Sequence, residues 1–129
     1  MNRFERTRND HSRELAEDYV ELVDTLIRER GEARAVEMAS RLGISHVSVT
    51  KTVQRLQREG YLRSEPYRSI FLTEKGAELA TLVSERHELV LAFLTRLGVS
   101  KEIAEIDAEG IEHHISDETL TAIRKFLKS

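Results

Sequence analysis

Apolar residues recur at helical spacing in the first third of this chain. From about 11 to 30 they lie three or four residues apart, which predicts a long amphipathic helix that Gly31 ends. A second, short helix is predicted at 33–42, and Ser45 is placed to cap a third across 46–60. Because a short turn containing glycine joins the second and third helices, the pattern indicates a helix-turn-helix.

The periodicity changes after Gly60. Two short runs of β-prone residues flank a polar turn from Glu65 to Ser69, which predicts a small β-hairpin. Helical spacing then returns, and three more helices are expected at about 74–97, at 101–115 and from 117 onward, with Thr73, Ser100 and Ser116 as their N-caps. The first of these has more apolar positions than one face of an isolated helix needs, which indicates a partner surface.

These elements predict a mainly α protein with two domains. Residues 1–74 are expected to form a winged helix-turn-helix domain whose wing is the β-hairpin, and residues 75–129 a helical domain. The single proline and the six glycines agree with a mainly helical fold.

The composition narrows the classes of function. The chain contains no cysteine, so disulfides, thiolate zinc sites and thiol catalysis are excluded, and any metal ion must be held by oxygen and nitrogen. No apolar run reaches the roughly 18 residues of a membrane span, and the start, MNRFERTRND, lacks the apolar core of a signal peptide. We therefore expect a cytoplasmic regulator of modest size, with no membrane partner.

Charge is unevenly distributed along the chain. Residues 45–75 contain six basic and three acidic residues, whereas residues 101–129 contain four basic and seven acidic residues. The third predicted helix lies in the basic segment, and in a winged helix this is the helix that enters the major groove of DNA.

The third helix separates into an apolar and a polar face. Val49, Val53 and Leu56 are expected to face the core. The polar face and the tip of the hairpin give the candidate DNA contacts, which are Ser45, His46, Ser48, Thr50, Lys51, Gln54, Arg55, Tyr67 and Arg68. Gln54 and Arg55 have the side chains best suited to base edges. A basic segment can also be only a solvated surface, but the adjacent wing and the charge contrast favour DNA binding.

Candidate metal ligands lie near both ends of the chain. On a helix, Glu109, Glu112 and His113 fall within an arc of about 100°, so their side chains can converge. Asp18 and Glu21 lie beside the apolar stripe of the first helix, where burying carboxylates is costly unless cations neutralise them. His87 could complete such a site. Taken alone, Asp18 and Glu21 favour an ordinary acidic surface, and His87 favours a packed or solvated histidine. The cluster at 109–113 fits a ligand set and an acidic face equally well.

Five stretches resemble a known family in their order and separations. EDYVELVDTLI, SVTKTVQRLQREGYL, YRSIFLTEKG, SERHELV and DAEGIEHHIS resemble the manganese transport regulators of the diphtheria-toxin-repressor-like family, over about residues 12–128. The resemblance implies a homodimeric winged-helix repressor that binds double-stranded operator DNA. It also implies that residues 75–129 form the metal-binding and dimerisation domain, with no SH3-like third domain. The metal ligands that it implies are Asp18, Glu21, His87, Glu109, Glu112 and His113.

The donor set favours manganese. Iron-responsive members of the family have a methionine where this chain has Asp18 and a cysteine where it has Glu112, whereas carboxylates and imidazoles suit Mn²⁺. Four carboxylates can neutralise two divalent ions, so two Mn²⁺ per subunit are expected. The alternatives are the same architecture responding to Fe²⁺ or Zn²⁺, a metal-independent winged-helix protein, and a dinuclear metal hydrolase. We expect no enzyme, because no general base or substrate pocket is evident.

Overall fold

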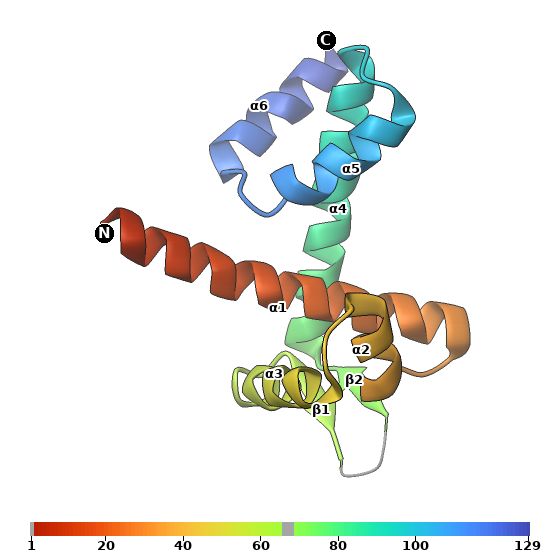
Figure 1. Cartoon of the computed structure of the whole chain (residues 1–129). Coiled ribbons are helices and arrows are strands. Elements are labelled where there is room, and N and C mark those ends of the chain that lie inside the picture. Colours follow the sequence, from red (N-terminus) through yellow and green to blue (C-terminus); the bar gives the residue numbers. More distant parts are fainter. Residues whose placement is uncertain (1, 66–68) are drawn as a thin grey trace. The chain divides into compact units, whose positions relative to one another are not determined.

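The computed structural model describes residues 2–65 and 69–129, except for the side chains at positions 6, 7, 9 and 10. The elements along these residues are α1 (Arg3–Arg30), α2 (Ala35–Leu42), α3 (His46–Arg58), β1 (Leu62–Ser64), β2 (Ile70–Leu72), α4 (Glu74–Arg96), α5 (Lys101–Ile111) and α6 (Asp117–Lys128) (Figure 1). They belong to two compact units. The winged unit is Leu15–Ala80, and the helical unit is Met1–Glu14 together with Thr81–Ser129.

The winged unit has one hydrophobic core. Buried residues from α1 to the start of α4 form a continuous cluster in which Tyr19, Leu26, Met38 and Leu56 are among the largest side chains. Val49, Val53 and Leu56 of α3 belong to this cluster, as their spacing predicts. α2 and α3 pack against each other, and α3 also contacts β1. The three helices and the hairpin confirm the predicted winged helix-turn-helix architecture (Figure 1).

The turn between α2 and α3 is fixed by two residues. Gly43 adopts a left-handed conformation with φ of 68°, and its N–H donates to the carbonyl of Ala39 at 2.9 Å. Ser45 is the N-cap of α3, because its Oγ accepts a hydrogen bond from the N–H of Ser48 at 3.1 Å. Glycine avoids the steric cost of the left-handed conformation, and the serine satisfies an N–H that the helix leaves unpaired.

The hairpin is attached to the helices through its own backbone. β1 and β2 pair antiparallel, with Leu62 opposite Leu72. The N–H of Ile70 donates to the carbonyl of Ala33 at 2.8 Å, and Gln57 Nε2 of α3 donates to the carbonyl of Ser64 at 3.0 Å. These bonds fix the base of the wing beside α3. The predicted tip residues Tyr67 and Arg68 lie outside the described residues.

α4 begins directly against the turn that precedes β1. Thr73 Oγ1 accepts from the N–H of Gly76 at 3.0 Å, which confirms Thr73 as the N-cap, and it donates to the carbonyl of Gly60 at 2.5 Å. A Cβ at Gly76 would lie 2.0 Å from the carbonyl oxygen of Tyr61. The absence of a side chain at position 76 therefore allows this close approach.

The helical unit packs α5 and α6 against the C-terminal part of α4 (Figure 1). Its buried apolar residues are Val83, Val90, Ala104, Ala108, Leu120 and Ile123. Phe93 of α4 meets Phe126 of α6 edge to face, with ring centroids 5.5 Å apart. Arg96 donates to the carbonyls of Phe126 at 3.2 Å and Leu127 at 3.0 Å, which satisfies acceptors at the C-terminus of α6.

Two predicted helix boundaries are wrong by more than two residues. α1 begins at Arg3 rather than near position 11, because polar residues extend it and Asn2 Oδ1 accepts from the N–H of Glu5 at 2.9 Å. α5 ends at Ile111 rather than at 115, and a turn follows it. The predicted domain division between 74 and 75 stays a prediction. Among the described residues, no helix is both long and apolar enough to cross a membrane.

Candidate metal centre and nucleic-acid interface

An imidazole and two carboxylates converge in the helical unit. His87 lies on α4, Glu109 lies on α5, and Glu112 is the C-cap of α5. His87 Nδ1 lies 2.6 Å from Glu112 Oε2 and 3.9 Å from Glu109 Oε1. One donor atom from each of the three residues lies within 4.8 Å of the others, which is a spacing that a single ion can bridge. The structure thus brings together three of the predicted ligands.

The local fold of α5 explains the arrangement of these acids. Glu105, Glu109 and Glu112 are spaced i, i+4 and i+7, so they share one face of the helix. Glu112 is beyond the last helical residue but keeps helical angles, with φ of −58° and ψ of −29°. Arg86 Nη1 of α4 donates to the carbonyl of Glu112 at 3.2 Å, which helps to hold this helix end.

The environment of Glu112 and His87 is electrostatically unusual. The side chain of Glu112 has no exposed surface, and a buried carboxylate is costly unless it is paired. Burial lowers the pKa of His87, but its hydrogen bonds with the Glu112 and Glu105 carboxylates outweigh this effect and leave that pKa above its usual value. The site therefore attracts positive charge, whether a proton on His87 or a cation beside it.

His113 forms a second group with a residue that the sequence analysis did not select. His113 is 3% exposed, and its Nε2 lies 3.6 Å from Glu112 Oε1. Donor atoms of Glu14, on α1, and His113 lie within 4.8 Å of each other. Arg13 Nη2 holds the carbonyl of His113 at 3.0 Å. The neighbouring His114 is half exposed and its Nε2 lies 3.3 Å from Glu14 Oε2.

Asp18 and Glu21 belong to the winged unit, and both are partly buried on α1. Asp18 follows Glu14 by four residues on the same continuous helix, so the two share a face of α1. This i, i+4 spacing is the sequence signal that could have identified Glu14. The placement of Asp18 and Glu21 in one site with the ligands of the helical unit stays a prediction.

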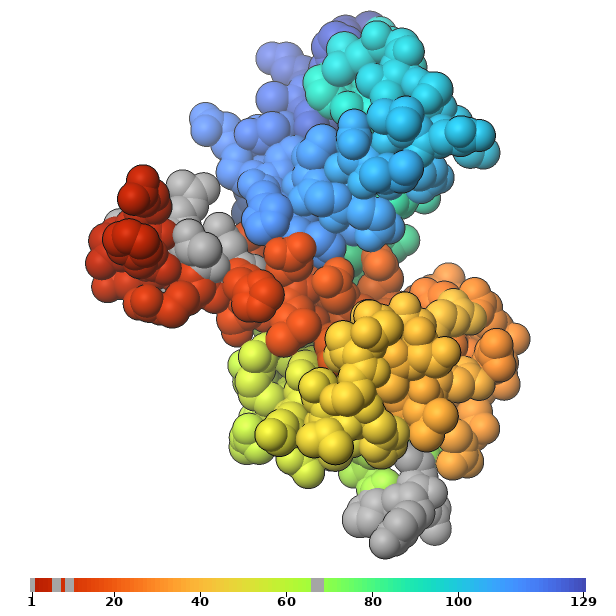
Figure 2. Space-filling model, in the orientation of Figure 1, coloured from red at the N-terminus to blue at the C-terminus, as the bar shows by residue number. Residues whose placement is uncertain are grey.

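The predicted polar face of α3 is present in the structure. The exposed residues among the candidates are Ser45, His46, Ser48, Lys51 and Gln54, whereas Thr50 and Arg55 are half-buried. Arg55 Nε also pairs with Glu59 Oε2 at 3.3 Å, one turn further along the helix. Figure 2 shows α2 and α3, in yellow tones, forming a continuous surface of the winged unit. Among the exposed candidate DNA contacts on α3, Gln54 and Lys51 have the longest side chains.

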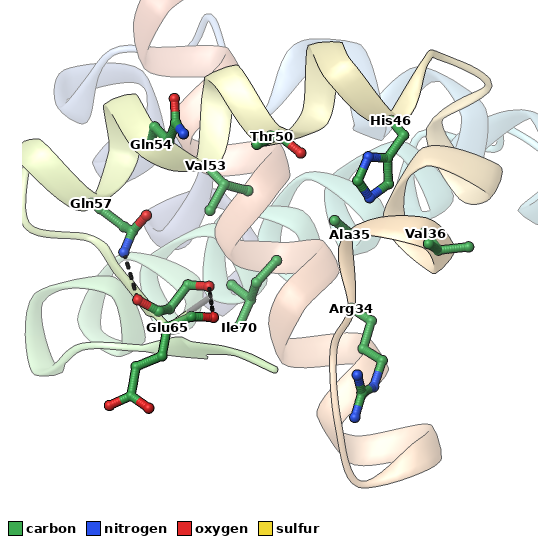
Figure 3. A pocket seen from close by; sticks show the side chains of 11 residues that line it. Arg34, Ala35, Val36, His46, Thr50, Val53, Gln54, Gln57, Glu65 and Ile70 are labelled. Atoms are coloured by element: carbon green, nitrogen blue, oxygen red, sulfur yellow. Dashed lines mark hydrogen bonds between the residues drawn. The ribbon is translucent and has the colours of Figure 1, made fainter. Parts of the chain in front are cut away.

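A groove of about 730 Å³ runs between α3, the start of α2 and the hairpin (Figure 3). His46, Thr50 and Gln54 line it from α3, and Ser64 and Glu65 line it from the hairpin side. Three of the candidate DNA contacts therefore face a hollow whose far side is the base of the wing.

The same groove includes Arg34, which the sequence analysis did not select. Arg34 Nε donates to Glu32 Oε1 at 3.0 Å, and Ser69 donates to the same carboxylate at 3.0 Å. The hydrogen bond from Arg34, together with that from Ser69, lowers the pKa of Glu32. Arg34 precedes α2, and no periodic pattern of the sequence marks it as part of the α3 surface.

Two family models match this chain in succession. The N-terminal DNA binding domain of the iron dependent repressors matches residues 12–70, and their metal binding and dimerisation domain matches residues 73–129. The transcriptional regulator MntR of Escherichia coli is 54% identical over 95% of this chain and 79% of its own length. The regulator MntR of Geobacillus kaustophilus is 46% identical over 78% of this chain and 71% of its own length.

The chain belongs to the iron-dependent repressor family. Like other members of this family, it is a metal-responsive DNA-binding transcriptional regulator. A solved manganese-dependent transcriptional repressor in complex with manganese is 26% identical, with a TM-score of 0.77 over 88% of this chain. The chain spans about half the length of that repressor, at 52%. The polar face of α3 lies within the DNA-binding match, and His87, Glu109, Glu112 and His113 lie within the metal-binding match.

Proposed function

We propose that this protein is a manganese-responsive repressor of manganese-uptake genes. The observation that carries the proposal is the convergence of His87, Glu109 and Glu112, because these three side chains offer only nitrogen and oxygen donors. Such donors fit Mn²⁺, whereas sites that prefer softer ions use sulfur. Curated relatives named MntR support a role in transcription rather than catalysis. A cytoplasmic location, where the operator is accessible, is part of the proposal.

The ligands would come from both parts of the chain. His87, Glu109, Glu112 and His113 belong to the region that matches the metal-binding domain, and Asp18 and Glu21 to the region that matches the DNA-binding domain. With four carboxylates among these six residues, the proposed site takes two Mn²⁺ per subunit. We add Glu14 as a candidate ligand, because its carboxylate lies close to His113.

Metal would act on DNA binding by joining the two regions. Bound Mn²⁺ neutralises the clustered carboxylates, and these would otherwise repel one another. A cation that has ligands in both regions stabilises the arrangement in which they are held together, so the population shifts toward it. The size of the response then depends on how much more tightly Mn²⁺ binds this arrangement than the others.

We also propose that the active form is a homodimer. Several large apolar side chains of the helical unit are exposed, including Leu97 at 58%, Ile103 at 50% and Ile106 at 67%. Ile103 and Ile106 lie one turn apart on α5, within the region that matches a dimerisation domain. A second copy of this chain would cover them. A dimer would also present two α3 helices to two half-sites of an operator, about one turn of DNA apart.

Titrations of operator DNA test the proposal. Binding should require Mn²⁺ and should be lost in chelator. Equal or stronger activation by Fe²⁺ or Zn²⁺ would favour the same architecture with a different metal. Equal binding in chelator would favour a metal-independent winged-helix protein. Metal-dependent turnover of a substrate, with an unchanged DNA response, would favour the hydrolase alternative.

A further inference from the structure

We propose that Glu105 is a positioning residue for His87. His87 uses both of its ring nitrogens in contacts with carboxylates. Nδ1 lies 2.6 Å from Glu112 Oε2, and Nε2 lies 3.0 Å from Glu105 Oε2. The inference rests on the proposed function, because it concerns the imidazole of the proposed metal site. Glu105 is not among the ligands that the sequence indicates.

The two sides of the His87 ring are not equivalent. Glu112 and Glu109 both lie on the Nδ1 side, at 2.6 Å and 3.9 Å, and these three residues form the group with ligand spacing. On the other side of the ring, Nε2 lies 3.0 Å from Glu105 Oε2. The two ring nitrogens point away from each other, so a carboxylate bonded to Nε2 does not share an ion bound at Nδ1. Glu105 therefore acts through His87 and not as a ligand.

The contact between Glu105 and Nε2 has a defined role when Nδ1 binds a cation. A neutral imidazole carries one ring proton, so binding through Nδ1 leaves that proton on Nε2. Glu105 is positioned to accept it. A carboxylate partner of this kind fixes the tautomer and the orientation of the ring and raises its basicity, and losing one typically weakens metal binding 10- to 100-fold.

The exposure of the two side chains sets the expected size of the effect. The His87 side chain is 17% exposed and the Glu105 side chain is 45% exposed. Water can partly replace a carboxylate that is this accessible, so the loss should be near the lower end of the range, about tenfold. Glu105 lies one helical turn before Glu109, which keeps it outside the pair of carboxylates that face Nδ1.

Mn²⁺ affinity of the full chain, measured by calorimetry without DNA, gives the first test. Glu105→Ala should bind Mn²⁺ about tenfold more weakly. Glu105→Gln keeps an acceptor oxygen and should recover part of the loss. Glu102→Ala is the matched control, because it removes an exposed acid from the same helix and changes the net charge equally. It should bind as the unchanged chain does.

The ring proton gives a second readout that a general loss of stability would not produce. In the chain loaded with diamagnetic Cd²⁺, the His87 Nε2–H signal should exchange slowly with solvent by NMR. Exchange should be faster in Glu105→Ala and unchanged in Glu102→Ala. Equal Mn²⁺ affinity of the two alanine variants, or identical exchange in them, overturns the positioning role.

Failure of the proposed function has a different signature. If His87→Ala binds Mn²⁺ as tightly as the unchanged chain, or the unchanged chain binds none, the metal site itself is wrong. A different result rejects only the role of Glu105. In that case the unchanged chain binds Mn²⁺, His87→Ala does not, and Glu105→Ala binds it as tightly as the unchanged chain.

Discussion

The side chain of Glu112 combines complete burial with a 2.6 Å contact to His87. It lies at the end of α5, and Arg86 holds its backbone carbonyl. Its substitution therefore changes the donor set of the proposed site directly, while the apolar stripe of α5 is left intact.

Replacing Glu112 with cysteine should change the metal preference of the protein. The substitution removes an oxygen donor and adds a soft thiolate, so preference should move from Mn²⁺ toward Fe²⁺, Co²⁺ or Zn²⁺. Loss of a residue that only hydrogen-bonds to a metal ligand typically weakens metal binding by about tenfold or more. Loss of a ligand itself should weaken Mn²⁺ binding by at least this factor. Calorimetric titration with each metal measures both effects.

Operator binding of the cysteine variant supplies the control. The variant should require more Mn²⁺ than the unchanged chain and should keep its response to the softer ions. An unchanged Mn²⁺ requirement, with unaltered thermal stability, would falsify the assignment of Glu112 as a ligand.

Single residues of the site could be predicted from sequence to the extent that they share one helix. Glu109 and Glu112 could be predicted in this way, because their spacing places them on one face of α5. The contact between Glu105 and His87 was not, since it joins α4 to α5 and depends on which helix faces meet. Glu14 shares a face of α1 with Asp18, but its contact with His113 could not be predicted, because His113 lies 99 positions further along the chain.

The candidate DNA contacts on α3 differ in how far their side chains are exposed. Gln54 is exposed and faces the groove beside the wing, whereas Arg55 is half-buried and paired with Glu59. The structure therefore favours Gln54 over Arg55 as the residue that reads a base edge.

Gln54→Ala should reduce specific DNA binding. If Gln54 makes a good base contact, its loss should cost about 1–3 kcal/mol on the operator and little on random DNA. Metal affinity should stay unchanged, because Gln54 lies outside the metal site. Fluorescence anisotropy with both DNAs measures the difference. A loss that is equal on the two DNAs would make Gln54 a phosphate contact instead.

Two helical glycines should respond oppositely to alanine. At Gly76 the added Cβ meets the carbonyl oxygen of Tyr61 at 2.0 Å, so Gly76→Ala should destabilise the chain by about 1–3 kcal/mol. At Gly110 the added Cβ meets nothing within 4 Å beyond its chain neighbours and the nearby backbone of its own helix, and the better helix propensity of alanine should stabilise the chain by up to about 1 kcal/mol. Chemical denaturation of the metal-free variants tests this pair. Similar unfolding midpoints of the two variants would contradict the close approach of Gly76 to Tyr61.

Elements were predictable where one side chain dictates local geometry. Ser45, Thr73 and Ser116 were identified as caps from their hydroxyls, and each accepts the expected backbone hydrogen bond. Ser100 occupies the predicted N-cap position of α5, but its side chain accepts no capping hydrogen bond. The start of α1 was not predictable from apolar spacing, because its first residues are mostly polar and are helical without an apolar stripe.

Metal binding and DNA binding should be coupled reciprocally. If Mn²⁺ raises operator affinity by some factor, the operator must raise Mn²⁺ affinity by the same factor, typically about 5- to 150-fold. Operator titrations with and without Mn²⁺, and Mn²⁺ titrations with and without operator, should give the same ratio. Equal operator affinity in chelator and in Mn²⁺ would show that the two sites are independent.

The sulfur-free donor set has a consequence for oxidative conditions. Thiolates are oxidised stepwise by peroxide, and a regulator with a cysteine ligand loses a donor when this happens. Carboxylates and imidazoles do not enter this series of reactions, and the chain has no cysteine elsewhere. A dose of hydrogen peroxide that abolishes the metal response of the Glu112→Cys variant should leave that of the unchanged chain intact. Under the proposed function, repression would then continue to respond to the Mn²⁺ concentration during oxidative stress.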